Sequence, residues 1–461
     1  MLLSGLLLPA LALAIYSMEW FDLNRWKAPL YNDGRWGIDT IGGGLAGGSW
    51  PSPLHNCYIF GAGPWVGAIV PSVTPDTLTT MFYNPTTGGT EGCPTLCRHW
   101  RDGTGNSEDR IYTYPGDWPP PASRFPMAPQ DPRSDMDMWC CYGDSDPARH
   151  DTFCYGRPLG IDVYLSAYGF SDSLAQDFFF LKYELANASG DSVRQAFFGM
   201  MLDADIGDAT DDRSCLLLDR KYVVNGETIQ VTNTGFAYDH NNVEVHGTKW
   251  DSGTPGAVAV MLLSAPNSLG LTALKRFSID IDPVTDAAQY QTLAGYNYRT
   301  GEYQPYDTNW LSPADVRMLL ATGPFDLAPD SIATFWYAII ASPFGDAGQN
   351  PTQRDTSDLV LRCKWARDFY DARLAGVAEQ KPEPAARTAP AATIVRGVLT
   401  LALSPRPRVS ESPCLLDACG RKVLDLRPGA NDVSRLSPGV YFVHSSLANR
   451  QSTTTKVIVT R

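Results

Sequence analysis

Apolar runs bounded by turn-forming residues recur through the middle of the chain and predict a β-rich body. β-branched and aromatic residues are frequent in these runs, and Gly, Pro, Asn, Asp or Ser stand at their ends, which is typical of strands. The predicted strands are Ile161–Phe170, Asp177–Leu185, Arg194–Leu202, Ala257–Leu263, Leu274–Ile281 and Ser331–Ala341.

Two connecting sequences predict hairpins. Asn187–Asp191 joins two of the predicted strands through residues that favour turns. Tyr222–Ile229 contains Asn225 and Gly226 at its centre, and this pair supplies the positive φ angles of a type I′ turn.

One segment, Asp358–Leu374, has the period of a helix. Leu359, Val360, Cys363 and Ala366 recur at spacings of three and four, so one face is apolar and packs on the body. The pattern therefore predicts a mainly β fold: a large β-sandwich body with one C-terminal packing helix, followed by a small C-terminal Ig-like β-sandwich.

Composition along the chain divides it into segments. Residues 377–392 are rich in Pro and Ala without periodicity, which indicates an extended linker. The linker separates a body, 15–376, from a C-terminal module, 393–461. Within the body, a Trp-, Gly- and Pro-rich part, 19–155, precedes the sandwich at 156–376, and the two are candidate subdomains.

The C-terminal module contains three apolar alternating runs separated by turn signals: Cys414–Leu426, Ser437–Val443 and Thr455–Arg461. Their order resembles the type A sorting domain of the type IX (Por) secretion system. The resemblance implies turns at two glycines, a central strand and a basic residue in the last strand. These residues are Gly420, Gly439, Val440, Tyr441, Phe442 and Lys456.

The resemblance also implies where the protein acts. Such domains are recognised by the outer-membrane secretion machinery and often removed, after which the body is attached to surface glycolipid or released. Four short segments of the body resemble an uncharacterised class of exported bacterial proteins with the same domain. They are Asn32–Gly37, Tyr58–Gly67, Asp203–Asp212 and Gly323–Pro329. An apolar segment at 1–14 predicts a cleaved signal peptide. We expect an extracellular or cell-surface location.

The net charge of the chain limits the classes of molecule that it is expected to bind. The sequence has 37 Lys and Arg against 50 Asp and Glu, a formal net charge of −13. Because nucleic acid attracts basic surfaces, it is a poor partner. No stretch reaches the roughly eighteen consecutive apolar residues of a membrane-spanning helix, so the mature chain is predicted to have no transmembrane segment.

The ten cysteines form an even set that suits an oxidising compartment. Cys93 lies near Cys97, and Cys414 near Cys419, so both pairs are candidate disulfides. Buried free thiols are the alternative, and paired Cys-x2-Cys zinc motifs are absent from the sequence.

An acidic loop is the leading candidate for chemistry. Five carboxylates in ten residues repel one another unless a hard cation neutralises them, which predicts calcium in a loop that is not an EF-hand. A solvated turn capped by Asp side chains and a set of catalytic carboxylates are the alternatives. The predicted ligands are Asp203, Asp205, Asp208, Asp211 and Asp212. Asp144 and Asp146 are a second candidate cation site, with a capped turn as the favoured interpretation.

No nucleophile or metalloenzyme motif stands out, which favours a carbohydrate- or protein-binding module, or a structural role, over an enzyme. A glycosidase is the enzyme alternative, because carboxylate pairs and sugar-stacking tryptophans are its usual components. A surface-coat component is the third hypothesis. The tryptophans in polar surroundings are Trp118, Trp139, Trp250 and Trp310.

Overall fold

The structure is a computed structural model of the whole chain. It describes residues 16–40, 45–74, 76–94, 108–150, 156–241, 243–244, 247, 249–278, 282–307, 312–343, 356–375, 393–396, 398–401, 413–417, 421–427, 429–446 and 452–460. The predicted signal peptide and the predicted linker lie outside these residues. Contacts divide the chain into two compact units, a body, Met1–Glu379, and a C-terminal unit, Gln380–Arg461.

The body contains a large antiparallel sheet of eight strands, in the order β13-β14-β15-β18-β11-β10-β9-β8. Its strands are β8 (Tyr112–Tyr114), β9 (Met136–Gly143), β10 (Ile161–Gly169), β11 (Phe178–Asn187), β13 (Asp212–Val224), β14 (Glu227–Asp239), β15 (Ala257–Ser264) and β18 (Ile332–Ser342).

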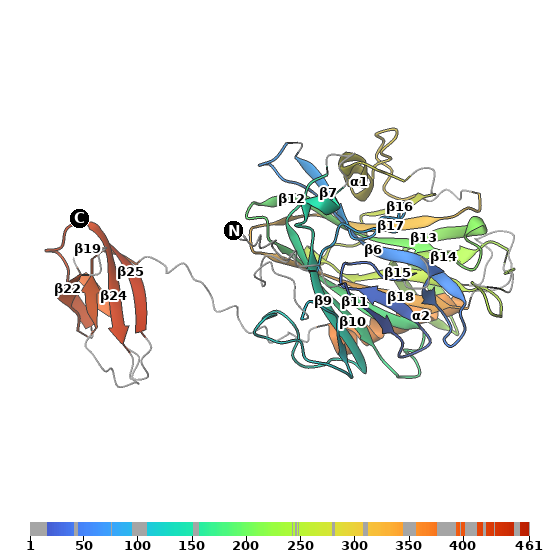
Figure 1. Cartoon of the computed structure of the whole chain (residues 1–461), viewed down its shortest axis with the longest axis horizontal. Coiled ribbons are helices and arrows are strands. Elements are labelled where there is room, and N and C mark those ends of the chain that lie inside the picture. The colour runs from blue at the N-terminus through green and yellow to red at the C-terminus, as the bar shows by residue number, and fades with distance from the viewer. Residues whose placement is uncertain are drawn as a thin grey trace, which may run out of the picture. The chain divides into compact units, whose positions relative to one another are not determined.

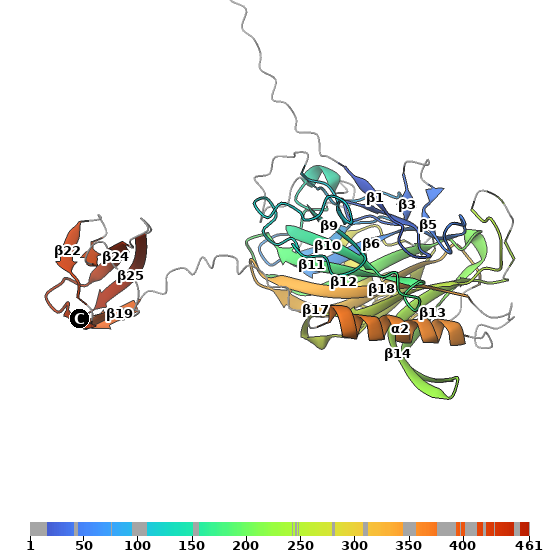
Figure 2. The ribbon, with the colours of Figure 1, turned by 90° about the horizontal axis from the view of Figure 1, so that it is seen from below.

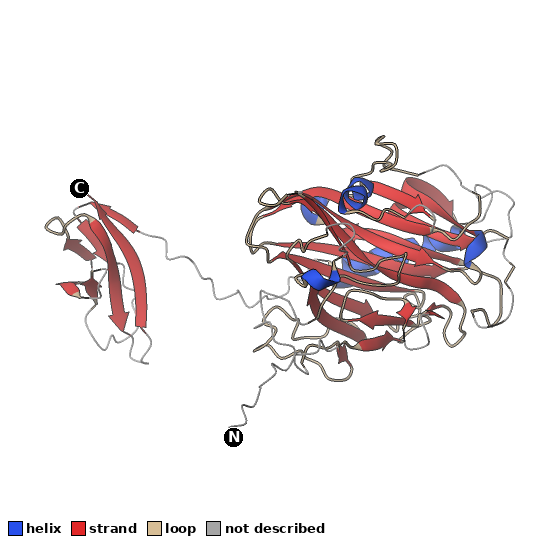
Figure 3. Ribbon diagram, turned by 45° about the horizontal axis from the view of Figure 1, so that its top comes forward, coloured by secondary structure: helices blue, strands red, loops and turns tan. Residues whose placement is uncertain are grey.

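A second sheet has the order β16-β17-β12-β6-β5, with β7 also paired to β6. Its strands are β5 (Gly48–Ser49), β6 (Cys57–Ile69), β7 (Thr77–Met81), β12 (Val193–Ala204), β16 (Ala273–Phe277) and β17 (Arg317–Leu327). Two small pairs stand apart from both sheets: β1 (Met18–Phe21) with β2 (Ala28–Tyr31), and β3 (Ile38–Asp39) with β4 (Leu45–Ala46). Figure 3 shows how strands dominate the body.

The predicted mainly β sandwich is confirmed, and the burial of its strands explains the apolar runs. Alternate residues of one strand enter different clusters: Phe179 of β11 joins the central core, and Phe178 joins the cluster beneath α2. In the same way, Phe198 of β12 faces the central core and Met201 faces the cluster beside α1. Strands buried on both faces have continuous apolar runs in place of strict alternation.

Two helices cover the outer faces of the sheets (Figures 1 and 2). Helix α2 (Ser357–Phe369), extended by a π-helical turn, η7 (Tyr370–Leu374), packs on β18, β14 and β13, as predicted. Helix α1 (Asp286–Leu293) packs against β7 and β6, and its weak apolar period explains why the sequence did not reveal it. Single turns of 3-10 helix are η1 (Pro147–Arg149), η3 (Ala209–Asp211) and η4 (Pro266–Ser268).

One of the two predicted hairpins forms. Asn225 and Gly226 have φ angles of 52° and 81° and join β13 to β14 as predicted. The prediction of a hairpin at Asn187–Asp191 is wrong, because β11 and β12 pair in different sheets and the segment crosses from one sheet to the other. Packing of two apolar faces outweighs the local turn signal there.

Strands from both parts of the body contribute to both sheets. From the Trp-rich part 19–155, β6 pairs with β12 in one sheet, and β9 pairs with β10 in the other. The body is therefore not divided between 19–155 and 156–376.

The C-terminal unit contains a sheet in the order β19-β25-β24-β21-β22 and a separate β20-β23 pair. Leu399, Leu415 and Val457 belong to a shared apolar cluster within it. Figure 1 shows β24 and β25 side by side. The strands are β19 (Thr393–Arg396), β20 (Val398–Leu401), β21 (Cys414–Leu416), β22 (Lys422–Asp425), β23 (Gly429–Asp432), β24 (Gly439–Ser446) and β25 (Ser452–Thr460).

A buried carboxylate ties the N-terminal segment and α2 to the large sheet. Asp177, directly before β11, lies 2.9 Å from Arg25 and accepts a 2.9 Å hydrogen bond from Trp50 Nε1. Its second oxygen accepts a 2.8 Å hydrogen bond from Arg362 of α2. Three separate segments thus meet at one side chain.

Replacing Asp177 by Asn should lower the free energy of unfolding by about 3 kcal/mol, because the mostly buried Arg362 and the half-exposed Arg25 both lose the counter-charge of a buried carboxylate. Chemical denaturation followed by circular dichroism measures the change. The matched control, Asp368→Asn, breaks only an exposed pair with Lys364 and should change it by less than about 0.5 kcal/mol. Equal effects of the two variants would contradict this role for Asp177.

Candidate functional site

The five predicted aspartates lie between the end of β12 and the start of β13, and the structure distributes four of them over two neighbouring carboxylate groups. Asp203, the second-last residue of β12, and Asp205 join Asp315 from the segment before β17. Asp211 joins Asp239 and Glu244 in the second group. In each group, one oxygen per residue lies within 4.8 Å of the others.

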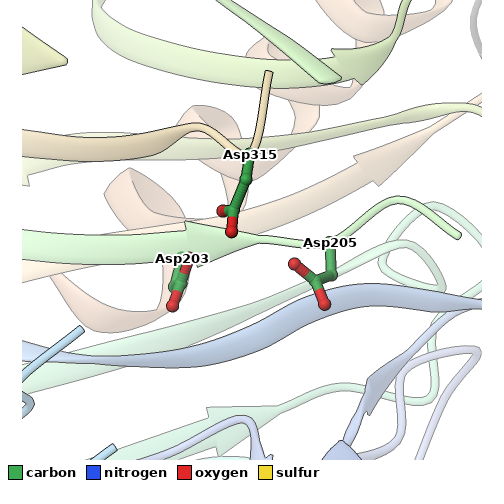
Figure 4. Close-up of side chains that lie close together, drawn as sticks. All are labelled: Asp203, Asp205 and Asp315. Atoms are coloured by element: carbon green, nitrogen blue, oxygen red, sulfur yellow. The ribbon is translucent and has the colours of Figure 1, made fainter. Parts of the chain in front are cut away.

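We call Asp203, Asp205 and Asp315 the pocket triad. Figure 4 shows Asp315 entering from a segment that faces the other two. The triad lines a pocket of about 560 Å³ together with Arg317 and Lys249. Asp315 and Arg317 could not be predicted from the acidic loop, since they lie just before β17 and at its first residue, more than a hundred residues away.

Asp203 is held by two partners. Tyr83 donates a 2.8 Å hydrogen bond from its hydroxyl to Asp203 Oδ2, and Arg317 Nε lies 3.3 Å from Oδ1. The Tyr83 ring fits there because residue 61 is glycine: a Cβ at Gly61 would lie 2.5 Å from the ring. Burial raises the pKa of Asp203 to about 7, although Arg317 and the Tyr83 hydroxyl act in the opposite direction.

The other acids of the pocket triad also face cations. Lys249 Nζ lies 2.8 Å from Asp205 Oδ2, and Arg317 Nη2 lies 3.8 Å from Asp315. Burial raises the pKa of Asp205, and the Lys249 hydrogen bond opposes this. The pocket is therefore a mixed-charge site whose carboxylates are largely compensated by the protein.

The second group, which we call the strand-end cluster, consists of Asp211, Asp212, Asp239 and Glu244. Asp212 begins β13 and stands directly opposite Asp239, which ends β14. Both side chains have 0% exposure. Like charges placed directly across a strand pair destabilise the sheet unless something neutralises them.

Asp212 has one satisfied and one unsatisfied oxygen. Its Oδ2 accepts a 2.9 Å hydrogen bond from the Ile206 N–H, whereas the buried Oδ1 has no hydrogen-bond partner among the residues that the structure describes. Burial raises the pKa of Asp212 well above its ordinary value, and Asp205, Asp239 and Asp211 raise it further.

Glu244 completes the cluster through a close approach to the backbone. Its carboxyl group occupies the space of a side chain at Gly207, where a Cβ would lie 1.9 Å from it, and Gly207 has a φ of 70°. The Asp208 N–H donates a 2.9 Å hydrogen bond to Glu244. Burial raises the pKa of Glu244 to about 7, with Asp239 and Asp211 among the further causes.

The two acidic groups differ in how the protein neutralises their negative charge. Within the described parts of the chain, no Lys or Arg forms an ion pair with Asp211, Asp212 or Glu244. Buried carboxylates without a counter-charge are costly, and oxygen ligands from several segments suit a hard cation. Both acidic groups can hold a metal ion, and the strand-end cluster has the stronger electrostatic need for one.

Three other predicted ligands have local roles. Asp208 caps η3 by accepting a 3.0 Å hydrogen bond from the Thr210 N–H, which lowers its pKa. The buried Asp144 carboxylate accepts hydrogen bonds from Thr80 and from three successive N–H groups at 159–161. Asp146 caps η1. Asp208 and Asp146 therefore cap their own turns, whereas Asp144 connects β7 to the segment at the start of β10.

The remaining predicted residues are placed as follows. Gly439 begins β24, which also contains Val440, Tyr441 and Phe442, and Lys456 of β25 stands opposite Phe442. Gly420, Cys97 and Cys419 lie outside the described residues, so both disulfides stay predictions.

The proposed sugar-stacking tryptophans are mostly unsuitable. Trp139 and Trp250 are fully buried, so their expected exposure is wrong. Trp118 is partly buried and donates a hydrogen bond to the Gln130 carbonyl, and Trp310 lies beyond the described residues. The two buried tryptophans therefore cannot stack on a sugar.

Comparison of the chain with protein-family models gives no match, and comparison with curated proteins gives no significant match. None of the helices in the described part of the chain has both the length and the apolar character needed to cross a membrane. The features that bear on function are therefore the two acidic groups and the C-terminal unit.

The pKa of Asp203 predicts a pH dependence of stability. The folded protein retains a proton that the unfolded chain loses above its ordinary pKa of 3.8, so this residue's contribution to stability falls as the pH rises towards about 7. In chelator, the unfolding free energy of the native protein should fall by about 4 kcal/mol relative to Asp203→Asn between about pH 4 and pH 8.

Chemical denaturation at each pH measures that difference. Asp208→Asn is the control: its carboxyl has a lowered pKa, so the native protein should gain stability relative to this variant only up to about pH 5, and the difference should stay nearly constant above that pH. A difference between native protein and Asp203→Asn that stays constant with pH would contradict the assignment.

Proposed function

We propose that this chain is an exported bacterial protein, secreted or displayed on the cell surface, with a calcium-stabilised body of binding or structural role and a type IX sorting domain at its C-terminus. The observation that carries the role of calcium is the strand-end cluster. Its four carboxylates are buried or half-buried at the junction of three segments, without a Lys or Arg partner for Asp211, Asp212 or Glu244 among the described residues.

Calcium suits this cluster better than other cations. All candidate ligands are oxygen atoms, which favours calcium or magnesium over zinc. Calcium accepts irregular geometry and bidentate carboxylates, and the four side chains come from a loop, two strand ends and an irregular segment. Extracellular calcium sites of this kind bind at about 0.1 to 1 mM.

The bound ion would stabilise the folded state. It would join the start of β13, the end of β14 and the segment that contains Glu244, while relieving repulsion between Asp212 and Asp239. Gly207 supports this interpretation, because only glycine leaves room for the Glu244 carboxyl group at that point.

Calcium added to chelated protein should raise the melting temperature by about 5 °C at a concentration of about 100 Kd, because the ion binds the folded state alone. Asp239→Asn and Glu244→Gln should each remove most of that increase. Differential scanning calorimetry measures it, and Mg²⁺ at the same concentration serves as the test of selectivity.

Two matched controls keep their full response to calcium: Asp146→Asn, which tests the second candidate site, and Asp203→Asn, which tests the pocket triad. A calcium response that Asp239→Asn and Glu244→Gln leave intact would refute the proposed site. The absence of any response in the native protein would refute calcium stabilisation itself.

The sorting role is supported by the sequence resemblance together with the compactness of the C-terminal unit. Residues 380–461 form a contact unit with an apolar cluster of their own. The partner is the outer-membrane secretion machinery, and the surface glycolipid is a possible later attachment for the body.

Deleting residues 380–461 should leave the body in the periplasm of a bacterium with a type IX secretion system, whereas a fluorescent protein fused to these residues should reach the outside. Fractionation and immunoblotting measure both. An isogenic strain without the outer-membrane translocon is the control and should export neither. Export of the truncated body would contradict the proposal.

A further inference from the structure

We infer that the pocket beside the pocket triad binds a neutral polyhydroxylated ligand, a carbohydrate. This inference depends neither on export nor on the cation, since it concerns a different group of residues. The pocket has a volume of about 560 Å³, within the range of small-molecule sites. It is lined by Arg35, Ile38, Thr40, Phe60, Lys249, Arg317, the triad, Ala209 and the 85–88 loop.

Unsatisfied hydrogen-bonding groups line this pocket. Arg317 is 4% exposed, and its Nε lies 3.3 Å from Asp203 Oδ1 and its Nη1 3.8 Å from Asp282 Oδ2. These are ion pairs without hydrogen-bond geometry, so among the described residues Arg317 Nε and Nη1, Asp203 Oδ1 and Asp315 Oδ1 make no hydrogen bond. Buried polar groups in proteins are nearly always satisfied, so unmet donors and acceptors on one wall indicate a missing partner.

Hydroxyl groups of a ligand suit these buried polar atoms of Arg317, Asp203 and Asp315. A hydroxyl donates one hydrogen bond and accepts others, so neighbouring hydroxyls can serve Arg317 and an aspartate together. An anionic ligand would be repelled by the three aspartates, and a cationic ligand by Arg317 and Lys249. A neutral polyol meets donors and acceptors without either penalty.

The pocket also offers an apolar surface. Phe60 of β6 is partly exposed and lines the pocket with Ile38 and Pro85. The negative face of an aromatic ring attracts the weakly positive C–H groups of a sugar ring. Phe60 thus replaces the buried tryptophans as the stacking residue, and the combination of a polar wall with an aromatic side selects a carbohydrate over a simple polyol.

The test is isothermal titration calorimetry of the full-length protein with methyl α-glucoside, methyl α-mannoside, methyl β-galactoside, maltose and cellobiose. Glucuronate and glucosamine serve as charged comparisons. At least one neutral sugar should bind more tightly than about 10 mM, and both charged sugars more weakly than that sugar. Binding should persist both in chelator and in excess calcium.

Asp315→Ala and Phe60→Leu should each weaken that binding about tenfold. Asp368→Asn, an exposed change on α2, should leave it within about twofold. Melting temperatures of all variants show that each is folded.

No heat of binding for any neutral sugar would overturn the inference, since it would mean that water satisfies the wall. Equal binding to native protein, Asp315→Ala and Phe60→Leu would overturn it too, because the sugar would then lie elsewhere. Neither result would bear on the calcium response of the strand-end cluster.

Discussion

The body depends on how it neutralises buried carboxylates where β12, β13 and β14 come together. Asp203, Asp205, Asp212 and Asp239 are each almost completely buried there. Burial and mutual repulsion both oppose ionisation, so such a junction requires cations, protons or both. The loop connects the two sheets of the sandwich, since β12 belongs to one sheet and β13 to the other.

The protein neutralises the acids of the 203–212 segment in two ways. In the pocket triad, Arg317 and Lys249 provide the positive charge, which leaves polar groups available to a ligand. In the strand-end cluster, the described residues supply no Lys or Arg partner for Asp211, Asp212 or Glu244, which leaves a place for an ion. The first arrangement favours recognition and the second favours stability, and this division separates the proposed binding site from the proposed structural site.

Much of this could be predicted from the sequence. The Asn225-Gly226 turn fixes the register of its hairpin, and that register places Asp212 opposite Asp239, so one missed ligand was accessible from the turn alone. The partners Asp315 and Arg317 could not be predicted from the sequence, because the pairing of β12 with β17 is long-range and leaves no local signal. The failed hairpin at Asn187–Asp191 has the same cause: the apolar faces of β11 and β12 decide their sheets, and the turn residues only permit the connection.

The most direct measurement is a crystal structure of the body grown in calcium. The account predicts an ion with carboxylate oxygens of Asp211, Asp239 and Glu244 at about 2.3 to 2.6 Å. Carboxyl groups that instead share protons in hydrogen-bonded pairs, with no ion between them at saturating calcium, would contradict it.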